Sequence, residues 1–171
     1  AVHHGHQRGI IHRDIKPANI IRQNLPESTS PQKTAPHSIP QYTLVDFGAA
    51  KAFTDTLQTG TSIGSAGYVA PEQAMGKATF ASDLYSLGVT CIHLLTGLHP
   101  FDLYSVSEDR WVWRQFLTQP VSTELRRVLD NLLQRATSQR YSSADQVLQA
   151  LRLEAAPNQS NTALDLSLIH I

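Results

Sequence analysis

The stretch HRDIKPAN, residues 12–19, decides the fold that this sequence predicts. It follows an apolar Ile-Ile pair and holds a carboxylate, an ammonium group and a carboxamide, on Asp14, Lys16 and Asn19. If the loop turns back on itself, these side chains can converge on one phosphoryl group. The carboxylate can accept a hydrogen bond from an attacking hydroxyl, the ammonium can neutralise phosphate charge, and the amide oxygen can bind magnesium. The stretch therefore indicates a loop built for phosphoryl transfer.

Three further motifs follow this loop in an informative order. A strand-like run, YTLV at 42–45, leads into DFG at 46–48; APE stands at 70–72, and an apolar, helix-like segment covers residues 81–95. Together with the first stretch, they match the motif order of the eukaryotic-type protein kinases. The chain thus resembles the C-terminal lobe of a bacterial serine/threonine protein kinase. The resemblance implies an α+β, protein-kinase-like fold over residues 1–152, mostly helical, with short β-strands near the catalytic loop.

The resemblance also implies a reaction, the transfer of the ATP γ-phosphate to a Ser or Thr hydroxyl of a protein substrate. Asp14 would orient that hydroxyl and accept its proton, while Lys16 would steady the γ-phosphate. Asn19 and Asp46 would hold magnesium, so the expected cofactors are ATP and Mg2+. Phe47 would pack into the core. Catalysis would then rest on positioning and charge neutralisation.

Residues 49–67 are polar and rich in hydroxyl groups, which is typical of a flexible loop. Because this loop lies between DFG and APE, the resemblance identifies it as an activation segment. Arg13 is then expected to pair with a phosphate on Thr59 or Thr61, which would order the loop. Ser65 stands where similar kinases place a hydroxyl that reaches the catalytic carboxylate and ammonium. Together, Ser65 and Lys16 favour Ser or Thr over Tyr as the acceptor residue of the substrate.

Two expected contacts would tie these motifs together. Asp83 lies within the apolar segment 81–95, and a buried carboxylate is costly unless it has donors. In kinases the matching Asp accepts backbone N–H bonds from the catalytic loop. Arg140 matches the kinase Arg that pairs with the Glu of APE, here Glu72, and so pins the activation segment to the helical lobe. Gly97 is expected to end the apolar helix.

Two amphipathic helices are predicted toward the C-terminus. Ser122 predicts an N-cap for the first, and Ser143 with Gln146 predicts a capping box for the second. Apolar residues recur in both at the spacing of one helical face. They are Leu125, Val128, Leu129, Leu132 and Leu133 in the first helix, and Val147, Leu148 and Leu151 in the second.

The composition argues against several other classes. A chain of 171 residues, 41% of them hydrophobic, can bury one ordinary core, so one domain is expected. Fourteen basic and fourteen acidic residues give zero formal net charge, which argues against a nucleic-acid partner. The longest apolar stretch, residues 84–98, is interrupted by polar residues and is too short for a membrane span. The single Cys91, inside an apolar run, indicates an inert core thiol in a reducing, cytoplasmic setting.

Three alternatives stay open on the sequence alone. His3, His4 and His6 invite a metal site, but they have no Cys or carboxylate beside them, so a structural role is favoured. The aromatic run 111–116 supplies either core anchors, which we favour, or the exposed docking patch of a helical interaction module. A non-catalytic pseudokinase scaffold is the main rival to an enzyme. Pseudokinases commonly lose the catalytic Asp, the Lys or the metal-binding Asp, whereas all three are present here.

The remaining segments lie outside the kinase-like motifs. Residues 24–40 are rich in Pro and are expected to form a surface insertion, and residues 153–165 a polar tail or linker. Residues 166–171 are expected to be a sequencing or cloning scar. A Gly-rich phosphate loop and a strand Lys paired with a helix Glu are both absent from the 171 residues. We therefore expect the ATP-binding N-lobe to lie outside this chain.

Overall fold

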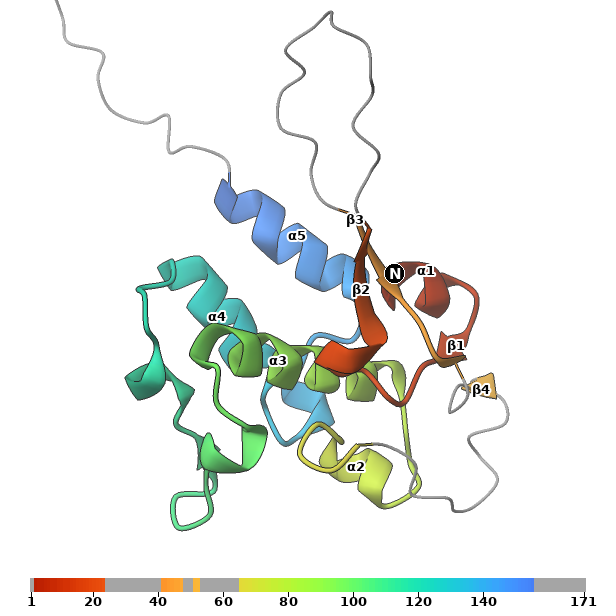
Figure 1. The fold of residues 1–171 in the computed structure, drawn as a ribbon. Helices are drawn as coiled ribbons and strands as arrows, with labels where there is room; N and C mark the ends of the chain where they lie inside the picture. The colour runs from red at the N-terminus through yellow and green to blue at the C-terminus, as the bar shows by residue number, and fades with distance from the viewer. Residues whose placement is uncertain (1, 24–40, 48–50, 53–64, 156–171) are drawn as a thin grey trace, which may run out of the picture.

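The computed structural model describes residues 2–23, 41–47, 51–52 and 65–155. These residues form a mostly helical structure with short strands, as the sequence predicts (Figure 1). The helices are α1 (Val2–Gln7), α2 (Pro71–Ala74), α3 (Phe80–Thr96), α4 (Thr123–Leu132) and α5 (Ala144–Ala155). Short 3-10 turns are η1 (Pro17–Asn19), η4 (Pro100–Asp102), η5 (Trp113–Phe116) and η6 (Thr137–Gln139).

The strands pair into three two-stranded antiparallel sheets. They are β1 (Ile10–Ile11) with β4 (Lys51–Ala52), β2 (Ile20–Gln23) with β3 (Gln41–Leu44), and β5 (Tyr104–Ser105) with β6 (Arg110–Trp111). Residues 12–19 connect β1 to β2, so strands anchor the catalytic loop at both ends. The strand predicted after the insertion is confirmed as β3, and short strands near the catalytic loop are present as expected. The insertion itself, residues 24–40, lies outside the described residues.

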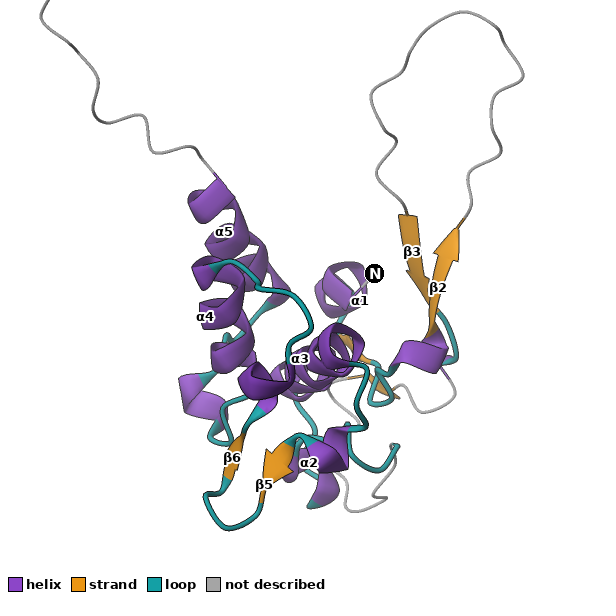
Figure 2. Cartoon of the chain, turned by 60° about the vertical axis from the view of Figure 1, so that its left-hand side comes forward, coloured by secondary structure: helices purple, strands orange, loops and turns teal. Residues whose placement is uncertain are grey.

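Helix α3 runs through the middle of the molecule, between α4 and the strands that flank the catalytic loop (Figure 2). The helix predicted over 81–95 is confirmed. It begins after Thr79, whose side chain forms a capping box with Ser82, and it ends at Gly97, which has a φ of 71°. That left-handed conformation is the one for which a residue without a Cβ is best suited. The side chains of Leu84, Val89 and Ile92 are fully buried, so α3 forms the centre of the core.

Helix α4 packs closely on α3, because Gly88 of α3 leaves room for it. A Cβ on Gly88 would lie 2.9 Å from Leu132 Cβ, closer than real Cβ contacts allow. The predicted N-cap is confirmed, since Ser122 Oγ accepts a hydrogen bond of 3.1 Å from Leu125 N. The predicted apolar face is also buried in the core, with Leu125 partly covered at its edge.

Helix α5 differs in part from the prediction. Gln146 N donates to Ser143 Oγ at 3.3 Å, but Gln146 Oε1 accepts from Ser142 N, one residue before the expected partner. Val147 is buried, whereas Leu148 and Leu151 are each 38% exposed, so the expectation that both leucines point inward is wrong. The reason is that the buried face of α5 is formed by Ala144, Val147 and Ala150, which recur every three residues. The two leucines lie beside this face.

The aromatic run 111–116 belongs mainly to the core. Trp113 is 1% exposed and Trp111 packs against the core cluster, so core anchoring is confirmed for these two residues. Phe116 is 36% exposed and does not share that role. Cys91 also packs against the core, and burial raises the pKa of its thiol to about 11, as fits an inert cysteine. Within the described part of the chain, no helix combines the length and apolarity that a bilayer crossing requires.

Candidate active site

Four polar side chains from two distant segments meet at Asp14. Ser65 donates to Asp14 Oδ1 from both its hydroxyl, at 2.8 Å, and its backbone N, at 3.1 Å. Lys16 Nζ lies 2.8 Å from Asp14 Oδ2 and 2.6 Å from Ser65 Oγ. Asn19 Nδ2 also donates to Asp14 Oδ2, at 3.0 Å. The structure therefore brings together Asp14, Lys16 and Asn19, which the sequence predicts as catalytic. It also places Ser65, predicted as part of the activation segment, in contact with Asp14 and Lys16.

These contacts determine the charge of Asp14. Burial raises the pKa of the carboxyl, but the hydrogen bonds from Lys16, Ser65 and Asn19, with the charge of Lys16, lower it by more. The result is a pKa below the ordinary value, so Asp14 is ionised at neutral pH. An ionised carboxylate next to an ammonium group can accept a proton from a hydroxyl while the ammonium balances nearby negative charge.

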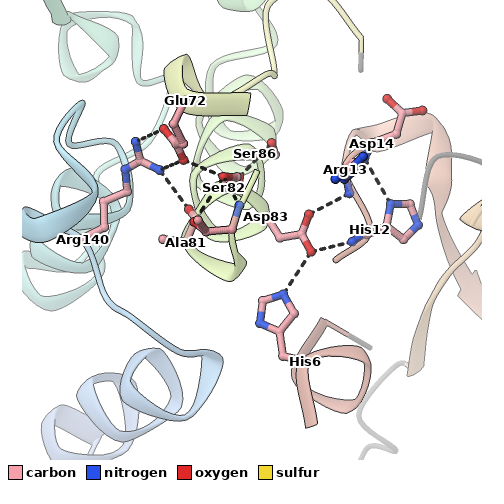
Figure 3. A network of polar contacts seen from close by, with 11 residues as sticks. His6, His12, Arg13, Asp14, Glu72, Ala81, Ser82, Asp83, Ser86 and Arg140 are labelled. Carbon is pink, nitrogen blue, oxygen red and sulfur yellow. Dashed lines mark hydrogen bonds and ion pairs between the residues drawn. The ribbon is translucent and has the colours of Figure 1, made fainter. Parts of the chain in front are cut away.

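Asp83 holds the backbone of the catalytic loop from beneath. It is 1% exposed, and its two oxygens accept hydrogen bonds of 2.8 Å from the backbone N of His12 and of Arg13 (Figure 3). His6 Nε2 lies 3.0 Å from Asp83 Oδ2. The donors expected for this carboxylate are therefore present. In Figure 3 the carboxylate of Asp14 points away from Asp83, so the loop backbone lies between the two carboxylates.

Arg13 has a strained backbone, with a φ of 69°. A non-glycine residue in this region costs on the order of 1–3 kcal/mol, so the surroundings must hold it there. Asp83 binds the Arg13 N–H, and Gln73 Nε2 donates to the Arg13 carbonyl at 2.6 Å. Gln73 is 2% exposed, and sequence reasoning missed it. Glutamine is usually a surface residue, so the sequence carries no signal for this role.

Asp46 follows β3, the end of which is held beside residues 12–19. Val45 N donates to the Asn19 carbonyl at 2.9 Å, and His12 Nε2 donates to the Val45 carbonyl at 3.1 Å. These bonds bring the backbone before Asp46 next to the catalytic loop. Asp46 itself is exposed and has a φ of 62°. Magnesium favours oxygen ligands and usually keeps several waters, so the carboxylate of Asp46 and the amide of Asn19 suit it chemically.

Phe47 differs from its expected position. It is 51% exposed, so the expectation that it packs into the core is wrong. Its ring contacts the ring of His12 edge-on, with centroids 4.7 Å apart. The physical reason is its place beyond the end of β3, where the described residues cover only about half of its surface.

Glu72 and Arg140 form the expected ion pair. Arg140 Nη1 donates to Glu72 Oε1 at 2.7 Å and Arg140 Nη2 to Glu72 Oε2 at 2.8 Å, a two-point contact (Figure 3). Ser82 Oγ donates to the same carboxylate at 2.6 Å. Burial raises the pKa of Glu72, but Arg140 and Ser82 together lower it below its ordinary value. The pair fastens α2, which follows the loop that carries Ser65, to α3 and to the segment before α5.

Some predicted residues cannot be placed. Thr59 and Thr61 lie outside the described residues, as do residues 156–171 with the expected scar. Arg13, their expected partner, is 6% exposed, and its Nε has no hydrogen-bond partner among the described residues.

The histidines near the N-terminus are placed by ordinary contacts. His3 Nδ1 lies 3.3 Å from Asp145 Oδ1, and His6 contacts Asp83. Across the described ranges, no group of three or more His, Cys, Asp or Glu side chains is arranged to hold a metal ion.

Comparison with known proteins agrees with this geometry. The sequence model of the family described as "Protein kinase domain" matches residues 1–151. The chain is 35% identical over 159 residues to serine/threonine-protein kinase B of Synechocystis sp., an alignment that covers 86% of this chain and 25% of the relative. It is 41% identical over 155 residues to serine/threonine-protein kinase C of the same organism, and this alignment covers 86% of this chain and 26% of the relative. Serine/threonine-protein kinase PknB of Mycobacterium leprae is 43% identical over 105 residues, which are 59% of this chain and 15% of that relative.

These alignments cover most of this chain but only part of each relative. The chain spans about a quarter of the length of the two Synechocystis kinases. The family match takes in the catalytic loop, α3 and most of α5. The chain therefore belongs to the protein kinase domain family and is a homologue of bacterial serine/threonine protein kinases.

Proposed function

We propose that this chain is the C-terminal lobe of an active serine/threonine protein kinase that acts in bacterial signalling. One observation carries the proposal. Ser65, from a loop far along the chain, places its hydroxyl 2.8 Å from Asp14 Oδ1 and 2.6 Å from Lys16 Nζ. A hydroxyl group thus fits between the proton acceptor and the cation, which is the arrangement that an acceptor Ser or Thr of a protein substrate requires.

Each residue of the site has a role in this reaction. Asp14, ionised because of its lowered pKa, orients the substrate hydroxyl and accepts its proton. Lys16 balances negative charge on the transferred phosphoryl group. Asn19 and Asp46 would hold magnesium bound with ATP, and that ion would supply positive charge at the phosphates. Asp83 positions the loop but does not touch the reacting groups.

The ATP-binding lobe is proposed to lie outside these residues. Two exposed apolar side chains on and after the strands that follow residues 12–19 support this arrangement. Ile21 on β2 is 50% exposed and Phe47 is 51% exposed, so both leave apolar surface that a second lobe would cover. In this proposal residues 1–152 form the lobe, and α5 continues beyond them to Ala155. Residues 24–40 form an insertion in the lobe. A cytoplasmic location stays part of the proposal.

Phosphorylation of the activation segment is a further part of the proposal. The proposed role of Arg13 is supported by its Nε, which is buried and has no hydrogen-bond partner among the described residues, since a phosphate brings strong hydrogen-bond acceptors. Thr59 or Thr61 would carry that phosphate. Phosphopeptide mapping of the active full-length protein is expected to find one of them modified. If both are unmodified, the assignment of these two residues is wrong.

The test is a phosphotransfer assay on the full-length protein that contains this chain, with labelled ATP, magnesium and a mixed protein substrate. The Asp14→Asn variant keeps the size of the side chain but removes the proton acceptor, so its rate is expected to fall by at least about 100-fold. The matched control is Asp145→Asn, because Asp145 is an exposed residue of α5. It should keep the wild-type rate.

The opposite outcome would favour the non-catalytic alternative. If wild type and Asp14→Asn show the same phosphotransfer, the site does not catalyse, and a pseudokinase-like scaffold becomes the better interpretation. The 171-residue chain alone is expected to show no turnover, because it lacks the residues of a Gly-rich phosphate loop. Autophosphorylation of the purified 171-residue chain would contradict the division into lobes.

A further inference from the structure

A groove rich in arginine runs along the side of the molecule that β5, β6 and α4 form, on the left of Figure 2. It consists of two hollows, of about 660 Å³ and about 300 Å³, and Arg114 lines both of them. The other arginines that line it are Arg110 and Arg135 in the larger hollow and Arg126 in the smaller. We call this surface the arginine groove. None of the described residues that line it belongs to the candidate active site, so the proposed reaction gives it no role.

Positive charge is in excess in the arginine groove. Four guanidinium groups line it, against the two carboxylates of Asp109 and Asp130. Glu108, which does not line the groove, adds a third carboxylate nearby. The ion pairs of this region are Arg135 with Asp109, Arg114 with Asp130 and Arg110 with Glu108. Since the whole chain has no formal net charge, the excess is a local feature of this face.

The ion pairs leave the arginines able to bind a further carboxylate. The side chains of Arg110, Arg114 and Arg135 are all more than half exposed. Exposed ion pairs are weak, so a carboxylate from a partner can share or replace the present one. A guanidinium has five N–H donors. The hydrogen bonds that Arg114 and Arg126 make with described residues use one donor each, so the remaining donors are available to a partner.

The floor of the arginine groove is apolar. Its apolar lining residues include Trp111, Val112 and Leu133 in the larger hollow, and Leu117, Pro120 and Val121 in the smaller. Arg114 is held beside this floor, because its guanidinium carbon lies 5.9 Å from the centroid of the buried Trp113 ring. A side chain that is already held in place loses less conformational freedom when a partner binds. The groove therefore combines positioned positive charge with apolar surface.

We propose that the arginine groove binds a segment of a partner protein that combines Asp or Glu with apolar residues. Arginine clusters recognise acidic motifs through charge-assisted hydrogen bonds, and the floor supplies the apolar contact. The charge is spread over four arginines in two joined hollows, which suits an extended chain better than a compact ion. A nucleic acid is disfavoured, because the carboxylates of Asp109 and Asp130 would face its phosphates. The inference goes beyond the proposed function and does not rest on it.

The experiment measures binding by fluorescence anisotropy, with the full-length protein that contains this chain and without ATP. The probe is a short labelled peptide in which Glu and Leu alternate between Ser residues, and matched peptides carry Gln or Lys in place of Glu. The proteins compared are wild type, Arg114→Glu, Arg126→Glu and Arg22→Glu. Arg22 is the matched control, because it is an exposed arginine on β2 and does not line the groove. Urea unfolding checks that each variant is folded.

We expect wild type to bind the Glu peptide at least about tenfold more tightly than the Gln peptide, because several exposed charge contacts act together. Arg114→Glu and Arg126→Glu should each lose most of this difference, whereas Arg22→Glu should keep it. Arg114→Glu should also bind the Lys peptide more tightly than wild type does, which tests the contact by a gain of affinity.

The inference is wrong if wild type binds the Glu and Gln peptides equally, or if Arg22→Glu weakens binding as much as Arg114→Glu does. It is also wrong if a single-stranded DNA of equal charge competes as well as the unlabelled Glu peptide, since that result indicates a general polyanion surface. If the Glu peptide does not bind and sedimentation shows a wild-type dimer that Arg114→Glu dissociates, the occupant is a second copy of this chain instead. Because binding is measured without ATP, a failure to bind leaves the proposed function intact, and a failure of phosphotransfer leaves this inference standing.

Discussion

Replacement of Arg140 by alanine is expected to remove a large part of the stability of this domain. The side chain of Arg140 is 0% exposed. Its guanidinium has five N–H groups, and five hydrogen bonds use them. Two reach Glu72, at 2.7 and 2.8 Å, and the others reach the backbone carbonyls of Ala81, Gln134 and Arg135. The guanidinium also stacks on the Tyr85 ring, 4.8 Å from its centroid.

The magnitude follows from what the truncation leaves behind. Breaking a buried ion pair by removal of one partner costs about 3–5 kcal/mol, because the other charge stays buried without compensation. The three carbonyls that lose their donor add to this cost. Domains of this kind have a free energy of unfolding of about 5–15 kcal/mol. We therefore expect Arg140→Ala to lower it by at least about 3 kcal/mol and to abolish phosphotransfer at growth temperature.

The measurement is urea-induced unfolding of the full-length protein, followed by tryptophan fluorescence, since Trp113 is buried in the core. Arg126→Ala is the control, because Arg126 lies on α4 and its guanidinium makes an exposed hydrogen bond of 3.3 Å to Thr123. That variant should change the free energy of unfolding by less than about 0.5 kcal/mol. A cost of less than about 1 kcal/mol for Arg140→Ala would refute the importance of the pair.

Three other predictions concern pH, packing and reactivity. The lowered pKa of Glu72 means that its ionised form stabilises the fold above the ordinary value of 4.5 and that this contribution is lost as the pH falls below it. Urea midpoints should decline there in wild type and less steeply in Glu72→Gln. Gly88→Ala should lower the free energy of unfolding by about 1–3 kcal/mol, because its methyl group would meet Leu132 Cβ at 2.9 Å; a neutral effect in urea unfolding would contradict this. Cys91, with its pKa raised to about 11, should react slowly with a thiol reagent at pH 8 until the protein is unfolded; rapid reaction of the native protein would count against its burial.

The sequence predicted the parts of the site that depend on residue type and motif order. Asp14, Lys16 and Asn19 were found from one loop because their chemistry is distinctive at that spacing. Glu72 and Arg140 were paired by resemblance, and their contact is present. Gln73 was missed, because a buried glutamine leaves no pattern along the chain.

Exposure was harder to predict than contact. Phe47, Leu148 and Leu151 were expected to be buried, and all three are partly exposed. A hydrophobic side chain at a helical or motif position shows that burial is favourable, but not whether another part of the protein is there to cover it. In α5, the helix is oriented with Ala144 and Val147 toward the core, so Leu148 and Leu151 stay partly exposed.

The sequence alone determined the family, the order of the motifs and the residues able to do the chemistry, because these depend on local side-chain types and on their spacing. Only the tertiary structure decided which side chains meet. Ser65 reaches Asp14 because the loop before α2 folds back over residues 12–19. Asp83 supports residues 12–19 because α3 passes beneath them. The turn η4 likewise packs on Gly67 only in the folded chain. Such contacts join residues far apart in the chain, so they exist only once the core has formed.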